Sequence, residues 1–167
     1  VLDIKGVPVM FDIAHPHPSL SEEEKAQYFK EIVLPGHATP YVLAGDFNSL
    51  SPADNYSRAK LISGLKDQVR EPEAVADSWL KRKAIPVLTS AGLIDSYKKI
   101  HDRSSDYTIP TDYLSQDKRS GVRIDYIFCS PDIKVKDAYV IQNAQTNKAS
   151  DHHPIVAILE IKKWKTN

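Results

Sequence analysis

A short apolar run followed by two polar side chains constrains this chain more than any other stretch. The run extends from Tyr41 to Ala44 and predicts a short buried strand. Gly45 lets the backbone turn, and Asp46 and Asn48 follow at a spacing of two, which in a strand places both side chains on one face. A carboxylate can accept a proton or hold a cation, and a neutral amide can donate to an anion. The alternative is a turn that uses Asp and Asn only for its backbone geometry.

A second polar loop favours a functional site. Residues Ser150–Pro154 read Ser-Asp-His-His-Pro, and the apolar run Ile155–Ile161 that follows predicts another strand. Two predicted strands are therefore each bordered by an Asp with a polar partner beside it. We expect these side chains to form one site at the edge of a buried sheet.

Length and charge limit the classes of protein to which the chain can belong. A chain of 167 residues fits one domain with a core of its own. The 22 Lys and Arg residues balance the 22 Asp and Glu residues, so no global basic field indicates strong nonspecific binding to nucleic acid or to an anionic membrane. The sequence has no signal-peptide pattern and no apolar run near about 18 residues, so stable membrane insertion is not expected.

The single cysteine, Cys129, lies within an apolar run, and one cysteine cannot form an internal disulfide. We interpret this residue as a small buried hydrophobe and not as a nucleophile. A chain without an internal disulfide is compatible with a reducing compartment, which slightly favours a cytoplasmic location.

The first third of the chain predicts a strand, a helix and a second strand. Apolar residues alternate over Val7–Ile13, which indicates a strand with one face on a core. Ser21 and Glu24 have the spacing of a capping box, and the helix that they begin is expected to span Ser21–Leu34 and to end at Pro35-Gly36. We interpret the acidic run Glu22–Glu24 as a solvated helix start. With the strand after it, this order indicates an α/β organisation.

The middle of the chain predicts three helices and a long loop. Helical composition covers Ser57–Leu65 and Glu73–Lys83, and Ile85–Ala91 predicts a short helix that Gly92 ends. His101–Arg119 is polar and aromatic without clear periodicity, which indicates either a substrate-facing loop or an ordinary surface loop.

Three further strands are predicted towards the end of the chain. Val122–Cys129 alternates, and Asp125 is a lone acid within this apolar run. Because burying an unpaired carboxylate is costly, Asp125 needs a cationic or donor partner, for which a histidine is the natural choice. Ile133–Ile141 and Ile155–Ile161 follow without crossover helices, so the sheets are expected to be mixed or mostly antiparallel.

Three segments, in this order, resemble motifs of the endonuclease/exonuclease/phosphatase superfamily, which includes pancreatic deoxyribonuclease. They are Gly45–Asn48, Arg123–Phe128 and Ser150–Pro154. Each segment alone is a weak signal, whereas three in order, each on a predicted strand or beside one, form a strong signal. The resemblance implies an α/β fold in which a β-sandwich of mixed and antiparallel sheets is flanked by helices, a four-layer α/β sandwich in the complete domain.

The resemblance extends over essentially the whole chain but covers only the C-terminal part of the family's domain. Residues 1–167 are therefore expected to be the C-terminal portion of one such domain, with its N-terminal half missing. In that half the family carries an Asn and, later, the Glu that is its principal metal ligand, and neither segment is found here. We expect the isolated chain to bind Mg²⁺ poorly and to turn over slowly, and the missing half counts among its expected partners.

The activity that the resemblance implies is metal-dependent hydrolysis of phosphate esters, as a phosphodiesterase, a nuclease or a phosphatase. Such hydrolysis needs an activated water and neutralisation of charge on the phosphoryl oxygens. By resemblance, Asp46 orients or deprotonates the water, and Asn48 holds the water or the phosphate. His152 contacts the phosphoryl oxygens or transfers a proton, and Asp125 hydrogen-bonds its other ring nitrogen, which sets tautomer and basicity.

The implied metal ion is Mg²⁺, with Mn²⁺ as the alternative, because hard cations prefer carboxylate oxygens and retained water. Its implied ligands are Asp46, Asn48, Asp151 and His152. The resemblance also gives the phosphate a second histidine, which is His15, with His17 as the alternative. His153 has the weaker claim, because the family varies at that position.

Three substrate classes stay open, namely nucleic acid, a phospholipid headgroup and a small phosphate ester. The formal net charge of zero slightly disfavours a dedicated nuclease. The alternative to an enzyme is a truncated or degenerate homologue that acts as a binding or assembly module without turnover. The intact set of polar site residues speaks against decay, because folding does not require all of them.

Overall fold

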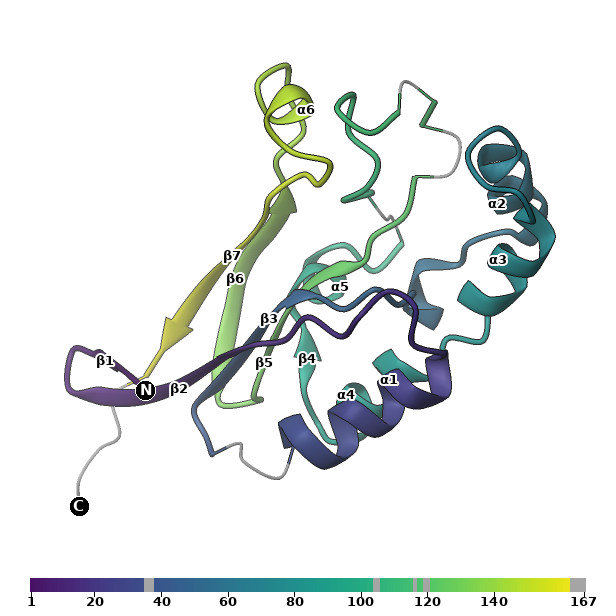
Figure 1. Cartoon of the computed structure of the whole chain (residues 1–167). Coiled ribbons are helices and arrows are strands. Elements are labelled where there is room, and N and C mark those ends of the chain that lie inside the picture. The colour runs from purple at the N-terminus through teal and green to yellow at the C-terminus, as the bar shows by residue number, and fades with distance from the viewer. Residues whose placement is uncertain (35–37, 104–105, 116, 119–120, 163–167) are drawn as a thin grey trace.

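A five-stranded mixed sheet forms the centre of the fold, with the strand order β1-β2-β3-β5-β4 (Figure 1). The computed structural model describes residues 1–34, 38–103, 106–115, 117–118 and 121–162. β2 and β3 are parallel, and the other neighbours in the sheet are antiparallel. The strands are β1 (Leu2–Ile4), β2 (Val7–Ile13), β3 (Tyr41–Asp46), β4 (Ile94–Asp95) and β5 (Asp125–Cys129).

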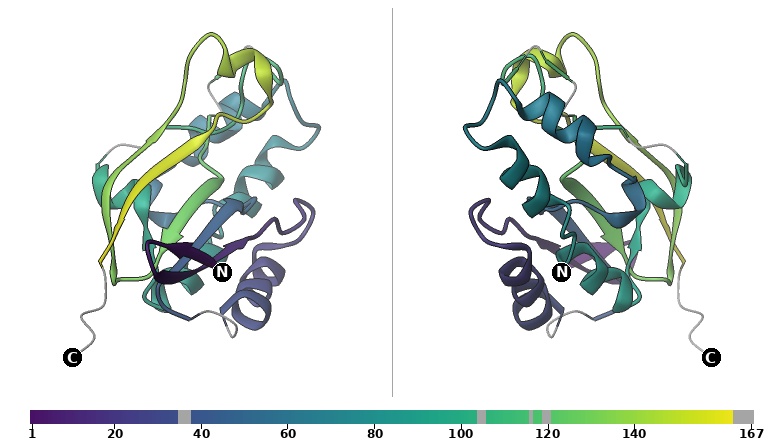
Figure 2. Two further views of the ribbon diagram at one scale, coloured as in Figure 1. Left: turned by 90° about the vertical axis from the view of Figure 1, so that its left-hand side faces the viewer. Right: turned by 90° about the vertical axis from the view of Figure 1, so that its right-hand side faces the viewer.

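A separate two-stranded sheet packs on one face of the central sheet. It consists of β6 (Ile133–Val140) and β7 (Ile155–Ile161), which pair antiparallel. Figure 2 shows this pair on the side of the central sheet that faces away from α1. The apolar interface contains Val7, Val9, Val42 and Cys129 from the central sheet and Ile133, Val135, Leu159 and Ile161 from the small one. Cys129 is thus a buried hydrophobe, as predicted.

Helices cover the other face of the central sheet. α1 (Glu22–Tyr28) continues as the π-helical turn η1 (Phe29–Val33), and α4 (Ala84–Ser90) lies beside it. Side chains alternate along β3, so Leu43 faces these helices while its neighbour Val42 faces the small sheet. The fold class predicted from the sequence, mixed sheets flanked by helices, is confirmed.

A second core lies under α2 (Arg58–Leu65) and α3 (Pro72–Trp79), where Leu61, Leu65, Ala76, Val122 and Ile124 are buried together. The remaining short elements are η3 (Pro52–Asp54), α5 (Ser96–Ile100) and α6 (Thr146–Ala149). Within the described part of the chain, no helix combines the length and the apolarity needed to cross a membrane.

The observed strands share most of the predicted boundaries and differ from the prediction at three of them. β2 and β7 have the predicted ranges, and β6 ends one residue earlier than predicted. β3 continues to Asp46, so this carboxylate belongs to the strand. β5 begins only at Asp125. Val122 makes an isolated bridge to Ile109, and the backbone N–H of Ile124 donates to the Thr108 hydroxyl and not to a neighbouring strand.

The observed helices begin close to where the sequence predicts. Ser21 forms the capping box with Glu24, and Ser57 caps α2. α3 ends at Trp79 and not at Lys83. The predicted stop of the first helix at Pro35-Gly36 lies outside the described residues.

The interpretation of Glu22–Glu24 as solvated is wrong for Glu22, whose side chain is buried. Glu22 Oε2 accepts from the Ser49 hydroxyl at 2.8 Å and from the backbone N–H groups of Lys83 and Ala84 at 2.9 and 3.2 Å. Glu22 therefore caps the start of α4 and joins it to α1. The capping box hides this role in the sequence, because the first turn of a helix favours acids in any case.

Gly45 marks a close approach between β3 and the chain that leaves β2. Its φ is +143°, and a Cβ added there would lie 2.0 Å from the carbonyl oxygen of Ala14. Ala14 N–H donates to Ala44 O at 3.0 Å, so the two segments cannot separate without losing a sheet hydrogen bond.

We expect Gly45→Ala to lower the free energy of unfolding by about 2–4 kcal/mol, because it combines an unfavourable φ with overpacking. Gly92→Ala is the matched control, since Gly92 also has a positive φ (+87°) but, among the described residues other than its chain neighbours, no atom lies within 4 Å of an added Cβ. The control is expected to lose about 1 kcal/mol. Urea denaturation measures both losses, and equal losses would show that the contact with Ala14 is unimportant.

Arg123 is fully buried beside the second core. Its guanidinium donates to Asp95 Oδ2 at 2.7 Å and to Asp54 Oδ2 at 3.0 Å. It also lies over the rings of Tyr126 and Tyr97, 4.4 and 4.9 Å from their centroids. The sequence pattern predicts no separate role for Arg123, because alternation only places it on the same face as Asp125.

Candidate active site

One cleft of about 640 Å³ gathers all the candidate site residues predicted from the sequence. It is lined by His15, His17, Pro18, Asp46, Asn48, Asp125, Asp151 and His152. The cleft lies where β3 ends and β5 begins, because these strands are antiparallel and Asp46 stands directly opposite Asp125 in their register. The two carboxylates therefore meet at one edge of the sheet.

Asp46 and Asn48 lie together because of a turn and not because of strand geometry. β3 ends at Asp46, and Asn48 has a left-handed backbone (φ +47°). The Asn48 backbone N–H donates to Asp46 Oδ1 at 2.8 Å, and its side-chain Nδ2 donates to Asp46 Oδ2 and to Pro16 O, both at 3.1 Å. The turn thus orients the carboxylate, and the Asn48 amide already uses its donors within the protein.

Asp125 and His152 form the predicted pair. His152 Nδ1 lies 2.8 Å from Asp125 Oδ2, and His152 Nε2 lies 4.0 Å from Asp46 Oδ2. The hydrogen bond with Asp125 raises the pKa of His152 above its ordinary value, against the opposing effect of burial. Burial is also the main cause that raises the pKa of Asp46, against the hydrogen bond from Asn48 N–H.

The other histidines differ in their relation to this pair. His15 Nε2 lies 3.5 Å from Asp46 Oδ2 on a largely exposed side chain. His17 lines the cleft but bonds Ser19, with Nδ1 2.7 Å from Ser19 Oγ. His153 is buried, does not line the cleft, and packs edge-on against the Tyr107 ring.

Two buried threonines support the site and were missed in the sequence. The Thr108 hydroxyl accepts from Asp125 N–H at 3.3 Å, and its carbonyl accepts from His153 N–H at 2.7 Å. Thr111 N–H donates to Asp151 O at 3.2 Å, and its hydroxyl donates to the carbonyl of Ser150. These residues belong to the loop predicted over 101–119, where no periodicity distinguishes a supporting threonine from a solvated one.

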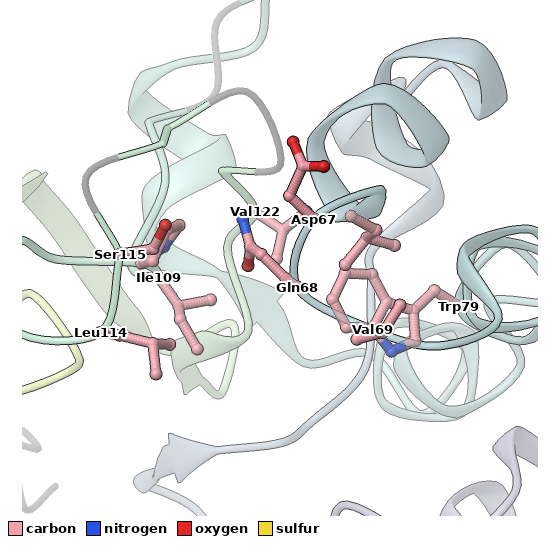
Figure 3. Close-up of a pocket in the computed structure, with 10 residues that line it drawn as sticks. Asp67, Gln68, Val69, Trp79, Ile109, Leu114, Ser115 and Val122 are labelled. Carbon is pink, nitrogen blue, oxygen red and sulfur yellow. The ribbon is translucent and has the colours of Figure 1, made fainter.

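The same loop borders a second, more apolar pocket of about 500 Å³ (Figure 3). Ile109 and Leu114 from the loop face Val69 and Trp79 from the α2–α3 side. Thr111 of this loop bonds Asp151 at the cleft. The loop therefore lines the second pocket and supports the backbone of Asp151, which lines the cleft.

The cleft also fits a metal ion. Among the described residues, Asp46, Asp125 and His152 each offer a ligand atom, and these atoms lie within 4.8 Å of one another. Two carboxylates are hard donors of the kind that Mg²⁺ or Mn²⁺ prefers. This cluster includes Asp125, which was predicted only as the partner of His152, and does not include Asp151, whose exposed carboxylate accepts from Ser150 Oγ at 3.2 Å.

We expect Asp125→Asn to lower the pKa of His152, because the variant removes the carboxylate whose hydrogen bond raises it. A raised folded-state pKa means that this pair stabilises the fold fully below the ordinary value of about 6.5, and that the contribution is lost as pH rises through the folded-state pKa. An NMR titration of the His152 ring in metal-free buffer measures the change. Asp151→Asn is the control and should shift the pKa less, since Asp151 acts on His152 only through space. Equal shifts would contradict the dominant role of Asp125.

Comparison with known proteins shows the family of this chain. The model of the Endonuclease/Exonuclease/phosphatase family matches residues 4–152. Among solved structures, an AP endonuclease from Archaeoglobus fulgidus is 21% identical with a TM-score of 0.64, and the match covers 95% of this chain and 63% of that one. The comparison with curated protein sequences gives no match.

Two further structures are of one Neisseria enzyme, NExo. The 3'-5' exonuclease NExo from Neisseria meningitidis is 28% identical with a TM-score of 0.51, over 72% of this chain and 45% of that one. A variant of the 3' phosphatase NExo from Neisseria, bound to product DNA hairpin, is 26% identical with a TM-score of 0.50, over 83% and 50%. The chain thus spans about half to two thirds of the length of these structures. Since the family model covers most of the chain, the chain belongs to the endonuclease/exonuclease/phosphatase family.

Proposed function

We propose that the cleft is the phosphate-binding and proton-transfer part of a metal-dependent phosphoesterase site. The observation that carries this proposal is the cluster of Asp46, Asp125 and His152, in which one histidine lies between two carboxylates at a sheet edge. Such an arrangement supplies both a base and a hydrogen-bond donor to a phosphate ester, which are the groups that its hydrolysis needs.

Asp46 is the base for the attacking water in this proposal. Its raised pKa makes it a better proton acceptor than an ordinary aspartate, while Asn48 fixes the direction of its oxygens. Because the Asn48 amide already donates to Asp46 and to the Pro16 carbonyl, we assign Asn48 to the orientation of Asp46 and not to the phosphate.

His152 is the donor to the phosphoryl oxygens. The pair with Asp125 favours the imidazolium form and leaves Nε2 directed towards the cleft side of Asp46. His15, whose Nε2 lies 3.5 Å from Asp46 Oδ2, is the second histidine that we assign to the phosphate.

The carboxylates of Asp46 and Asp125 are the groups that we assign to a divalent ion, with Asp151 and Asn48 as further candidate ligands. When bound, Mg²⁺ or Mn²⁺ would neutralise charge on the phosphoryl group. Ligands outside residues 1–167 complete the ion's shell in this proposal, in line with the share of the matched structures that the chain spans.

Nucleic acid is the substrate class that we propose, because the similar enzyme NExo is described as a 3'-5' exonuclease and as a 3' phosphatase bound to product DNA hairpin. In a protein that also carries the expected N-terminal half, we expect release of phosphate from a DNA hairpin with a 3' phosphate in the presence of Mg²⁺, and no hydrolysis of sphingomyelin vesicles. A colorimetric phosphate assay and a phosphocholine assay measure the two reactions. If only sphingomyelin is hydrolysed, nucleic acid is rejected as the substrate class, and the proposal of a phosphoesterase is retained.

A further inference from the structure

Lys25 on α1 is buried, although lysine is among the side chains least often found in protein interiors. Its side chain is 4% exposed, and burial lowers its pKa. Glu22 Oε1 lies 3.9 Å from Lys25 Nζ, which is too far for a hydrogen bond. Burying an ammonium group with so distant a counter-charge is unfavourable, so another contact must account for its position.

That contact is the backbone of the turn that follows β3. Lys25 Nζ donates to the Asn48 carbonyl at 2.5 Å. Asn48 has a left-handed backbone, which is sparsely populated for residues other than glycine. One residue further on, the Ser49 hydroxyl donates to Glu22 Oε2 at 2.8 Å. Two side chains of α1, three positions apart and hence on one helix face, thus hold two successive residues of the turn, Asn48 by its backbone carbonyl and Ser49 by its hydroxyl.

The turn after β3, held by these two contacts, orients the Asp46 carboxylate. Each Asp46 oxygen accepts from Asn48, Oδ1 from the backbone N–H at 2.8 Å and Oδ2 from the side-chain amide at 3.1 Å. A change in the Asn48 backbone therefore moves both oxygens. The anchor itself is rigid, because Glu22 Oε2 also accepts from Lys83 N–H and Ala84 N–H at the start of α4.

We infer that Lys25 is a positioning residue, which keeps Asn48 in the left-handed conformation that directs the Asp46 carboxylate into the cleft. The expected effect on catalysis rests on the function proposed above, whereas the effect on the Asn48 backbone does not. A misplacement of about 1 Å in such a group can reduce a rate by about a hundredfold.

Lys25→Met tests this role, because it keeps the aliphatic stem and removes the donor. Lys30→Met is the matched control, since Lys30 follows on the same helical segment and is exposed. Hydrogen exchange followed by NMR reports on the Asn48 N–H, which donates to Asp46, and on the Leu43 N–H in the middle of β3. We expect exchange at Asn48 to accelerate by about tenfold or more in Lys25→Met relative to Leu43, and to stay unchanged in Lys30→Met.

Kinetics on the same samples give the second readout. In Lys25→Met we expect kcat to fall by about 10- to 100-fold with little change in KM, because the phosphate-binding histidines are untouched. Unchanged relative exchange at Asn48 overturns the inference whether or not the wild type is active. An active wild type with an unaltered kcat in Lys25→Met overturns it as well.

Absence of activity in a wild type that also carries the N-terminal half rejects the proposed function. Faster exchange at Asn48 in Lys25→Met then still supports the contact by which Lys25 holds the turn. Ser49→Ala is the second variant if Lys25→Met does not fold, because it removes only the hydroxyl that bonds Glu22. It should accelerate exchange at Asn48 in the same direction by a smaller factor, and no acceleration there overturns the inference.

Discussion

In a protein that also carries the N-terminal half, His152→Ala is expected to lower the rate of phosphate-ester hydrolysis by a factor of about 10² to 10⁴ and to leave the fold intact. The imidazole is half-buried between Asp125 and Asp46, and alanine supplies no donor to the phosphoryl oxygens. Circular dichroism and thermal unfolding check the fold, and steady-state kinetics on the phosphorylated DNA hairpin measure the rate.

Two controls accompany this variant. His17→Ala removes a histidine that lines the same cleft but bonds Ser19, so it is expected to lose far less activity than His152→Ala. Removal of divalent ions with EDTA should silence the wild type, and added Mg²⁺ should restore it. Full activity in His152→Ala would contradict the role assigned to His152, and turnover without a divalent ion would contradict the proposed metal dependence.

Arg123→Met is the variant with the largest expected loss of stability, about 3–5 kcal/mol. The guanidinium pairs with two buried carboxylates, those of Asp54 and Asp95. Methionine has no charge and no donor, so both carboxylates lose their ion pair with residue 123. Arg123→Lys should restore little, since one ammonium group cannot reproduce the planar donors that reach both acids. Chemical denaturation gives the free energy of unfolding for each variant.

Arg58→Met is the matched control for this prediction. Arg58 also forms a two-point contact with a carboxylate, at 2.6 and 2.9 Å from Asp77, but both side chains are more than half exposed. Exposed pairs contribute about 0–1 kcal/mol, so Arg58→Met should lose no more than that. Similar losses in the two Met variants would show that burial does not set the strength of the Arg123 contacts.

The sequence predicts the parts of this molecule that depend on local pattern. Alternation predicts β2 over its observed range, and an apolar run does the same for β7. The cost of a lone buried carboxylate correctly predicts a histidine partner for Asp125. Proximity of Asp46 and Asn48 is also predicted, but for the wrong reason, since a left-handed turn and not a strand brings them together.

Long-range support cannot be read from such patterns. Glu22 looks like an ordinary acid in a helix start, and its bonds to Ser49 and to the start of α4 exist only once the two helices pack. Thr108 and Thr111 lie in a segment without periodicity, although they fix the backbones of Asp125 and Asp151. Tertiary contacts between distant segments decide the role of each of these residues.

The register that places Asp46 opposite Asp125 has a thermodynamic consequence. Like charges at directly opposed positions of antiparallel strands repel, and the Asp125 carboxylate accordingly contributes to the raised pKa of Asp46. The cleft is therefore a weak point of the sheet on its own, and any cation that enters it relieves the repulsion and is coupled to folding by mass action. Stability and chemistry compete at this one pair of residues, so a selection for stability alone would remove the site.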